Sequence, residues 1–319
     1  MPEVFVDEKL CKGCGLCVEF CPRQVLELAD EPSSAGYTVA EPVKLDQCTS
    51  CGICYQVCPD YAVTVKGERR SGEAIEFSKP KALSGLQTSY CPGCTHGVVH
   101  RIIAEVIDEL DIRESTIGVT SIGCSIFIYK YLDVDYVEGA HGRAPAVATG
   151  IKQVHPDNVV FTYQGDGDIG AIGTAEIIHA AVRGESITAI FVNNGNYGMT
   201  GGQMAPTTLM GHVTTTSPGG RNVSHGHPLH VADMLATIKG PSYLVRGSAD
   251  TPRNIRDLKK YVKRAFQRQV NNEGFSLVEV LGICPTNWGK SVPDSFTLLR
   301  EEMMAEFPLG EIKVPGEVE

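Results

Sequence analysis

The sequence contains no long apolar run. No segment approaches the roughly 20 consecutive apolar residues that a membrane-spanning helix requires. The opening residues, MPEVFVDEKL, have neither the basic start nor the apolar centre of a secretory signal. We therefore expect a cytoplasmic protein without a membrane partner. The composition is not that of a disordered chain, because 42% of the 319 residues are hydrophobic, and this length suits one small and one large globular domain.

Clustered basic residues are also missing. The formal net charge is -10, and no segment gathers the lysines and arginines that would neutralise a nucleic-acid backbone, so we expect no nucleic-acid partner. Disulfides are not expected either, because the 12 cysteines lie in a chain without an export signal and the cytosol keeps thiols reduced. Metal binding is then the leading explanation for the cysteines.

One cysteine pattern occurs twice near the beginning of the chain. The first copy is CKGCGLCVEFCP at residues 11–22, and the second is CTSCGICYQVCP at residues 48–59. In such a pattern three thiolates bind one iron-sulfur cube and the fourth binds the other cube. Structural zinc or a disulfide framework is the alternative, but two complete copies favour clusters. The spacing predicts two 4Fe-4S clusters, one held by Cys11, Cys14, Cys17 and Cys58 and the other by Cys48, Cys51, Cys54 and Cys21.

With this pattern, residues 1–66 resemble a bacterial-type two-cluster ferredoxin, a small α+β domain that passes single electrons. Residues 31–47, between the two cysteine groups, are predicted to form a turn followed by a strand pair. Residues 67–88 are polar and lack a sustained apolar period, so we predict a linker there. Residues 89–319 form the second predicted domain.

The second domain alternates strands and helices. Short apolar segments predict strands, and an apolar residue at every third or fourth position predicts helices. Thr251 and Pro252 are typical of a helix cap and a first helical residue. The alternation predicts an α/β fold with a doubly wound parallel sheet. The predicted helices are residues 97–110, 171–184 and 252–274, and the predicted strands are residues 158–163, 186–194 and, as the last strand, 275–282.

Two polar motifs follow two of these strands. QGDGDIGAIG begins at residue 164, and VNNGNYGM begins at residue 192. Because neighbouring parallel strands end at the same edge of a sheet, we expect Asp166 and Asn194 to meet there. Their oxygens suit Mg2+, and Gly165, Gly167 and Gly170 allow backbone amides to approach a diphosphate. An ordinary turn at the end of a strand is the alternative.

Together the two motifs resemble the diphosphate-binding motif of thiamine diphosphate enzymes. This resemblance implies a Mg2+ ion bound by the side chains of Asp166 and Asn194 and by the main-chain carbonyl of Asn196. It also implies that the diphosphate is contacted or covered by Asp168 and by residues 197–203, which include Tyr197 and Thr200.

Four cysteines lie outside the duplicated pattern: Cys91, Cys94, Cys124 and Cys284. One more 4Fe-4S cluster needs four thiolates, and these positions adjoin elements whose ends should face the diphosphate site. A thiol redox pair in the CxxC segment and a buried apolar role for Cys124 are the alternatives. We predict a third cluster beside the cofactor.

Several segments between residues 89 and 290 carry a wider resemblance. They are YCPGCTHG, SIGCS, EGAHGRAPAVATGIK, YQGDGD, VNNGNYGMTGGQMAPT and CPTNWG. Together they resemble the beta subunit of 2-oxoacid:ferredoxin oxidoreductases, and the ferredoxin-like part resembles the delta subunit of that family, fused to the beta chain. The chain departs from the family at Thr95, where the usual segment CPGCGHG has a glycine.

The family resemblance implies a coenzyme A-dependent oxidative decarboxylation of a 2-oxoacid, with electrons passing singly through three clusters to an external ferredoxin. It also implies alpha and gamma partner subunits, with the glutamate that activates the thiamine on the alpha subunit. His96, His141, Gly142 and Arg143 match segments near the diphosphate and the substrate. Structural hydrogen bonding is the alternative for His96, whereas the Arg143 guanidinium suits an anion.

Other interpretations stay open at this point. The motifs favour a branched-chain substrate such as 2-oxoisovalerate, with 2-oxoglutarate or pyruvate as alternatives. A pure electron-transfer protein would hold about eight iron atoms and no thiamine, against about twelve for three clusters. A non-redox thiamine enzyme would not need the four separate cysteines. We predict a loop at His225, His227 and His230, packing for Trp288, and a solvated tail or subunit contact at residues 309–319.

Overall fold

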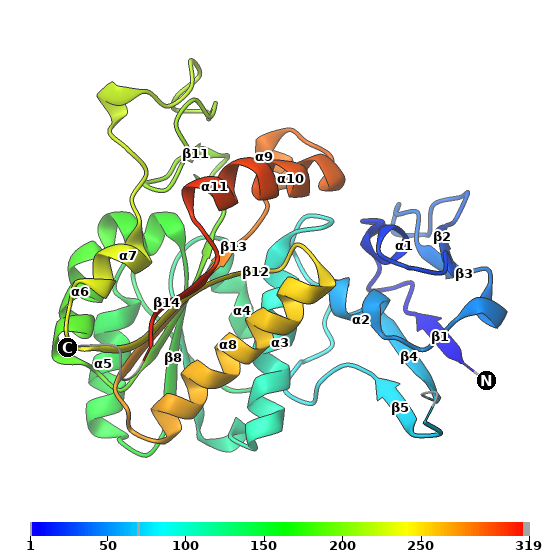
Figure 1. The fold of residues 1–319 in the computed structure, drawn as a ribbon, viewed down its shortest axis with the longest axis horizontal. Helices are drawn as coiled ribbons and strands as arrows, with labels where there is room; N and C mark the ends of the chain where they lie inside the picture. The colour runs from blue at the N-terminus through cyan, green and yellow to red at the C-terminus, as the bar shows by residue number, and fades with distance from the viewer. Residues whose placement is uncertain (1, 69–70, 315–319) are drawn as a thin grey trace.

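The computed structural model describes residues 2–68 and 71–314. Figure 1 shows a small amino-terminal part beside a larger α/β part that contains the remaining elements. We term the small part the head, which comprises the described residues up to 77. We term the larger part the core, which comprises residues 89–314. None of the described helices combines the length and the hydropathy that a membrane crossing demands.

Two small sheets form the head. β1 (Glu3–Val6), β4 (Val63–Glu68) and β5 (Ala74–Phe77) pair antiparallel, and β2 (Leu26–Leu28) pairs antiparallel with β3 (Ala40–Pro42). The strand pair predicted within residues 31–47 is therefore corrected, because β2 precedes that segment. The predicted linker 67–88 contains β5, since a short strand without buried side chains is held by pairing with β4 and leaves no apolar pattern.

The two cysteine patterns adopt the same local structure. α1 (Leu16–Glu19) and α2 (Ile53–Val57) each begin after a glycine in the left-handed region, Gly15 at φ 77° and Gly52 at φ 71°. Glycine adopts this conformation without a steric penalty. The chain therefore turns sharply in both copies, and the third cysteine of each pattern lies at the second position of the short helix.

Seven strands form the central sheet of the core, in the order β14-β12-β13-β9-β8-β6-β7. All neighbours are parallel except β14, which is antiparallel to β12. This arrangement confirms the predicted doubly wound sheet. The strands are β6 (Thr116–Thr120), β7 (Asp135–Glu138), β8 (Val159–Gly165), β9 (Thr188–Asn193), β12 (Pro241–Ser248), β13 (Phe275–Leu281) and β14 (Gly310–Lys313).

Helices cover both faces of this sheet (Figure 1). Phe161 and Tyr163 of β8 pack in one hydrophobic core with α3 and α8, whereas Val160 of the same strand packs in a second core with α5, α6 and α7. Such alternation is expected of a strand that is buried on both faces. The helices are α3 (Thr95–Leu110), α5 (Ala144–Val154), α6 (Thr174–Arg183), α7 (Val231–Ala236) and α8 (Pro252–Val270).

Capping residues define several helix ends. Thr251 accepts a hydrogen bond from the N–H of Asn254 at 3.1 Å, and the α8 helix begins at Pro252, as predicted. The α6 helix ends at Gly184, which is left-handed at φ 62°. The α8 helix ends before Gly274, because Asn272 adopts a left-handed conformation at φ 55° that stops the helix earlier.

The carboxyl-terminal segment corrects a further expectation. The strand at residues 275–282 is not the last one, since β14 adds an antiparallel edge strand to β12. Part of the predicted solvated tail is therefore ordered in the sheet, although its sequence GEIK is too short to show a strand period. Residues 315–319 lie outside the described structure.

Shorter elements connect these parts. Between β11 (Gln203–Met204) and α7 the chain forms a long loop, termed the excursion, that projects beyond the sheet (Figure 1). The elements are η1 (Leu45–Gln47), η2 (Arg113–Ser115), η3 (Cys124–Phe127), α4 (Ile128–Tyr131), η4 (Asp168–Ile172), β10 (Asn196–Tyr197), β11 (Gln203–Met204), η5 (Val223–His225), α9 (Pro285–Trp288), α10 (Val292–Leu298), η6 (Leu299–Met303) and α11 (Met304–Glu306).

Candidate functional site

A pocket lies at the carboxyl edge of the central sheet, where β6, β8 and β9 end. This edge is where doubly wound folds bind their ligands. Gly142 adjoins the pocket, and its N–H donates to Asp168 at 2.7 Å. The lining contains most residues that the sequence predicted for the cofactor: His96, His141, Gly165, Asp166, Gly167, Asp168, Asn194, Asn196, Tyr197 and Thr200.

Asp166 is a buried carboxylate in the pocket lining. Its Oδ1 accepts the N–H of Gly167 at 2.7 Å, and its Oδ2 accepts the N–H of Gly195 at 2.7 Å and the hydroxyl of Thr207 at 2.6 Å. Burial raises the pKa of the Asp166 carboxyl to about 6, although these donors oppose the shift. A bound cation would favour the ionised form, so the carboxylate fits the predicted Mg2+ site.

Asn194 and Asn196 follow β9 and are also buried. The carbonyl oxygen of Asn194 accepts the side-chain N–H of Asn196 at 3.1 Å and the indole N–H of Trp288 at 3.2 Å. Trp288 therefore holds this turn in addition to packing. Among the described residues, the side-chain oxygen of Asn196 has no hydrogen-bond partner. A buried oxygen without a partner fits a site that a cation or a ligand donor completes.

Asp168 is satisfied within the protein. Its carboxylate accepts hydrogen bonds from Ser121 at 2.9 Å, from the N–H of Gly142 at 2.7 Å and from Gln164 at 2.5 Å, and it is also hydrogen-bonded to Nδ1 of His141. These partners occupy both carboxylate oxygens. The geometry therefore favours a role for Asp168 in positioning His141 over direct contact with a diphosphate.

His96 is buried in the pocket lining, and its Nδ1 lies 2.7 Å from the hydroxyl of Tyr163. Burial lowers the pKa of the His96 imidazole to about 3 and raises the pKa of the Tyr163 phenol well above its ordinary value, so both are neutral. The phenol then donates to Nδ1, because a buried hydroxyl proton without an acceptor is costly. The hydrogen of the neutral ring consequently lies on Nε2, which can donate to a bound ligand.

Arg143 is not one of the residues that line the pocket. It forms an ion pair with Glu176 at 2.5 Å and donates to the carbonyl oxygen of Ile172 at 3.0 Å. The expected anion-binding guanidinium therefore joins the start of α5 to the start of α6. The physical reason is the packing of these two helices, which places Glu176 within reach of Arg143.

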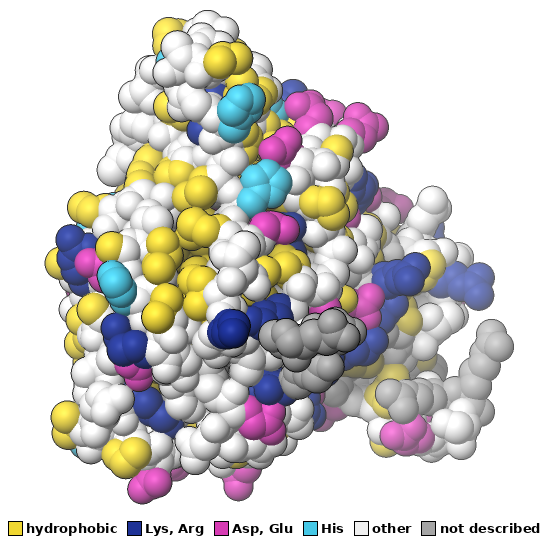
Figure 2. Space-filling view, turned by 60° about the vertical axis from the view of Figure 1, so that its left-hand side comes forward, with side chains coloured by type: hydrophobic (Ala, Val, Ile, Leu, Met, Phe, Trp, Pro, Cys, Tyr) yellow, Lys and Arg dark blue, Asp and Glu magenta, His cyan; other side chains and the backbone are white. Residues whose placement is uncertain are grey.

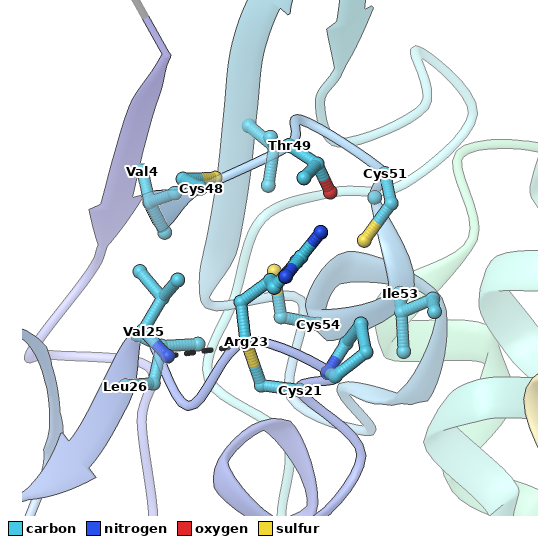
Figure 3. A pocket seen from close by; sticks show the side chains of 13 residues that line it. Val4, Cys21, Arg23, Val25, Leu26, Cys48, Thr49, Cys51, Ile53 and Cys54 are labelled. Carbon is cyan, nitrogen blue, oxygen red and sulfur yellow. Dashed lines mark hydrogen bonds between the residues drawn. The ribbon is translucent and has the colours of Figure 1, made fainter. Parts of the chain in front are cut away.

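The head cysteines line two separate cavities. Each cavity takes three cysteines from one copy of the pattern and one from the other copy, as the spacing predicts. Figure 3 shows the cavity of Cys48, Cys51, Cys54 and Cys21, in which the cysteine sulfurs point toward a common space. The inner set is Cys11, Cys14, Cys17 and Cys58, and the outer set is Cys48, Cys51, Cys54 and Cys21.

The environment of these thiols suits a metal cluster. Burial raises the pKa of Cys14 and of Cys54 to about 12, and nearby cysteines of the same set add to both shifts. Bound iron would offset this penalty by stabilising the thiolates. Within the described residues, no three or more His, Cys, Asp or Glu side chains are grouped so that they could hold a single metal ion. A 4Fe-4S cube differs from one ion, because each thiolate binds a separate iron atom.

The four remaining cysteines, termed the core set, come from three loops that meet beside the pocket. Cys124 itself lines the pocket. A Cβ placed on Gly198 would lie 3.2 Å from the Sγ of Cys124 and 3.6 Å from that of Cys284. Burial, followed by the charges of Cys284 and Cys91, raises the pKa of Cys124 to about 12. Burial also raises the pKa of Cys94, with the other three core cysteines contributing.

The three histidines of the excursion do not share one site. His230 lies 2.9 Å from Glu306, whereas Nδ1 of His225 accepts the N–H of Asn222 at 3.1 Å. His227 is exposed. These separate contacts agree with the prediction of a loop.

Sequence reasoning missed side chains that hold the predicted residues in place. Thr207 donates a hydrogen bond to Asp166, and Trp288 donates one to the carbonyl oxygen of Asn194. Asn287 donates to the Sγ of Cys284 at 3.3 Å. All three belong to VNNGNYGMTGGQMAPT or CPTNWG, segments that carry the family resemblance. The resemblance was therefore the signal that could have found them.

Comparison with known protein families defines the class. Residues 121–280 match the family described as thiamine pyrophosphate enzyme, C-terminal TPP binding domain, and residues 10–63 match the 4Fe-4S dicluster domain. The chain thus combines the thiamine diphosphate-binding domain of a class of enzymes with a ferredoxin-type domain.

Individual relatives narrow this class. Ketoisovalerate oxidoreductase subunit VorA of Methanothermobacter marburgensis is 49% identical over 234 residues, which cover 73% of this chain and 49% of the relative. 2-Oxoglutarate synthase subunit KorB of Archaeoglobus fulgidus is 41% identical over 216 residues, covering 68% of this chain and 77% of the relative. The chain belongs to the family of 2-oxoacid:ferredoxin oxidoreductase subunits, as a beta-type subunit with a fused ferredoxin domain.

A solved structure agrees with this assignment. The 2-oxoglutarate:ferredoxin oxidoreductase from Magnetococcus marinus, with 2-oxoglutarate, coenzyme A and succinyl-CoA bound, matches with a TM-score of 0.63 and 26% identity over 74% of this chain and 84% of that chain. The chain spans about half the length of the VorA relatives that it matches.

Proposed function

We propose that this chain is the thiamine-binding and electron-transferring subunit of a complex that oxidises a 2-oxoacid with coenzyme A to acyl-CoA and CO2. Thiamine diphosphate supplies the electron sink for cleavage of the bond to the carboxylate when it is bound. The core, inner and outer sets would each hold one 4Fe-4S cluster, and these clusters would supply one-electron acceptors for the reaction.

One observation carries this proposal: the core set adjoins the pocket of Asp166. Cys124 belongs to both, so an electron acceptor held by the core set would contact the cofactor pocket. A non-redox thiamine enzyme has no use for four cysteines in this place. A pure electron-transfer protein has no use for the pocket.

The pocket residues have separate roles in this proposal. Asp166 and Asn194 would hold Mg2+ together with an oxygen of Asn196, and the Mg2+ would bind the diphosphate oxygens. His96 would donate a hydrogen bond from Nε2 to the bound substrate or cofactor. Asp168 would keep His141 oriented at the same pocket.

A branched-chain 2-oxoacid is the proposed substrate class, with 2-oxoisovalerate as its simplest member. The support is the name of the 49% identical VorA relative, which is a ketoisovalerate oxidoreductase subunit. 2-Oxoglutarate is the second candidate, because the 41% identical KorB relative and the matched solved structure both carry that substrate in their names.

We infer that alpha and gamma subunits and an external ferredoxin are the partners, in the cytoplasm. The core exposes large hydrophobic side chains on α5, on α6 and just before α6, including Val154 at 73%, Ile172 at 54% and Val182 at 54% exposure. Figure 2 turns this side of the molecule forward and shows hydrophobic side chains interspersed with charged ones. Such a mixed surface supports contact with another protein subunit.

The proposed function is tested on the anaerobically purified complex. We expect about twelve iron atoms per chain, extractable thiamine diphosphate, and ferredoxin reduction that requires both coenzyme A and a 2-oxoacid. A panel of 2-oxoacids should give the highest kcat/KM for branched-chain members. About eight iron atoms and no thiamine would instead indicate a simple electron carrier.

A further inference from the structure

A cleft of about 400 Å3 lies between the head and the core, where α2 packs beside α8 (Figure 1). Its walls come from α2 and β5 of the head and from α3 and α8 of the core. It shares no lining residue with the pocket of Asp166. Small-molecule sites have volumes of about 300 to 1,000 Å3. The cleft is therefore large enough for a ligand that contacts both parts of the chain.

The head supplies aromatic side chains to this cleft. Tyr55 of α2 and Phe77 of β5 both line it, and their ring centroids lie 5.9 Å apart. Tyr55 is buried, whereas Phe77 is half-buried, so part of the Phe77 ring stays accessible. Phe77 also packs against Gly52, where an added Cβ would lie 2.6 Å from the ring. A fixed and partly accessible ring is a surface on which a planar base can stack.

The core supplies cations to the same cleft, namely Arg101 of α3 and Arg256 and Lys259 of α8. Lys259 is paired with the carboxylate of Glu105 at 2.7 Å. Arg256 forms no ion pair with any described carboxylate, and its Nη1 donates only to the side-chain oxygen of Gln56 at 3.3 Å. The Arg256 guanidinium therefore keeps most of its donors for a ligand.

Arg101 has a donor that the chain does not satisfy. This residue is 1% exposed, forms an ion pair with Glu105 and donates from Nη2 to the carbonyl oxygen of Gln56 at 2.5 Å. Its Nε–H has no hydrogen-bond partner among the described residues. A buried donor without an acceptor is unfavourable, so it indicates an acceptor that this part of the chain does not supply.

Positive charge exceeds negative charge on the walls of the cleft. The two carboxylates that line it are Glu76 and Glu105. Glu76 pairs with Lys66, which does not line the cleft, at 3.3 Å, and Glu105 is shared by Arg101 and Lys259. The whole chain has a formal net charge of -10, so this local excess of cations is contrary to its overall balance. Such a site favours an anion.

We propose that the cleft binds a nucleoside phosphate, with its base against Phe77 and its phosphate against Arg256 and Lys259. The aromatic side chains belong to the head and the cations to the core, so the ligand needs a ring at one end and an anion at the other. Arginine is well suited to phosphate because its donors match the oxygens of that group. The bound ligand would stabilise the docked head, because only the docked arrangement presents both walls.

The test uses the anaerobically purified complex, saturated with thiamine diphosphate, Mg2+ and coenzyme A so that other phosphate sites are filled. Calorimetric titration compares AMP with ribose 5-phosphate, which lacks the base, and with adenosine, which lacks the phosphate. The site variants are Arg256→Gln and Phe77→Leu. Arg253→Gln changes an arginine of the same helix that is 85% exposed and does not line the cleft. Phe5→Leu changes an exposed phenylalanine of β1 and is the aromatic control.

We expect AMP to bind the parent at least about tenfold more tightly than ribose 5-phosphate or adenosine, because each of these lacks one of the two contacts. Arg256→Gln should weaken AMP binding by about tenfold or more. Phe77→Leu should weaken AMP binding to a similar extent but leave ribose 5-phosphate binding unchanged. Both controls should bind AMP as the parent does.

Three results would overturn the proposal. They are no AMP binding by the parent, AMP binding that both site variants leave at the parental affinity, and ribose 5-phosphate binding as tight as that of AMP. Iron content shows whether each variant is intact. If Phe77→Leu loses iron, the comparison of AMP with ribose 5-phosphate in the parent still tests the contact with the base.

This proposal goes beyond the proposed function and fails separately from it. AMP binding in the cleft requires no turnover, so a complex that oxidises no 2-oxoacid would still bind AMP. Conversely, a complex that does not bind AMP would still reduce ferredoxin with a 2-oxoacid and coenzyme A.

Discussion

Gly167 lies against the ring of Tyr197, and this contact predicts the effect of a single methyl group. A Cβ on Gly167 would lie 2.2 Å from Cε1 of Tyr197 and 2.5 Å from its Cζ. The ring would have to move, which would break the hydrogen bond of 3.0 Å from its hydroxyl to the carbonyl oxygen of Gly167. Overpacking of this kind costs about 1–3 kcal/mol, and the lost hydrogen bond costs about 0.5–1.5 kcal/mol.

Because Tyr197 is only half-buried, its ring can relieve part of the clash by moving toward solvent. We therefore expect Gly167→Ala to lower the free energy of unfolding by about 1–3 kcal/mol. Since the displaced ring belongs to the pocket lining, thiamine diphosphate affinity should fall by about 5-fold to 150-fold if the cofactor must bear the same cost. Urea denaturation measures the first effect, and calorimetric titration with thiamine diphosphate and Mg2+ measures the second.

Gly165 provides the matched control within the same motif. A Cβ at this position would meet no atom within 4 Å, so Gly165→Ala should leave the unfolding free energy unchanged. A loss of cofactor affinity in Gly165→Ala alone would report directly on the approach of the diphosphate to the backbone. Equal unfolding free energies for the parent, Gly165→Ala and Gly167→Ala would refute the packing argument.

Three further predictions concern the cluster, the pocket and the buried imidazoles. Cys124→Ser should remove about four iron atoms per chain while the head keeps its two EPR signals, and an unchanged iron content would contradict a third cluster. Tyr163→Phe should lower kcat of the complex because the orientation of His96 is no longer fixed, and should cost about 1–3 kcal/mol in urea denaturation for the unpaired ring nitrogen; kcat equal to that of the parent would exclude the orienting role. Burial lowers the pKa of His100 well below 6.5, so the unfolded chain binds a proton that the folded chain does not, and stability should fall as pH drops below 6.5. His100→Phe should reduce this slope by up to ~1.4 kcal/mol per pH unit, whereas an unchanged slope in denaturation between pH 6.5 and 5 would contradict it.

Features of the fold that depend on neighbouring residues could be predicted from the sequence. The cysteine spacing predicted the crossed grouping of the inner and outer sets. The spacing is informative because each cysteine pattern folds locally, with a left-handed glycine before its short helix. The cap at Thr251 depends on Asn254, three positions later, and was predicted for the same reason. The position of Asp166 and Asn194 at one sheet edge follows from the parallel order of β8 and β9.

Features that depend on distant partners could not be predicted in this way. Glu176 lies far from Arg143 in sequence, and only the packing of α5 against α6 brings them together. Tyr163 looks like an ordinary strand residue, yet it meets His96 of α3 across 67 positions of sequence. The strands β5 and β14 lack an apolar period, so their pairing with β4 and β12 is what defines them.

The two head cavities show why equal motifs do not imply equal chemistry. Both copies supply the same ligand spacing, but Lys12 and Asp60 line the inner cavity as a buried pair of opposite charges, whereas Arg23 lines the outer cavity and Cys51 is exposed. Cluster potentials respond to nearby charge, hydrogen bonds and solvent. The two sites should therefore differ in potential even though their spacing is identical. The duplicated motif thus yields two different sites, because a buried Lys12–Asp60 pair lines the inner cavity, whereas an exposed arginine and an exposed cysteine line the outer one.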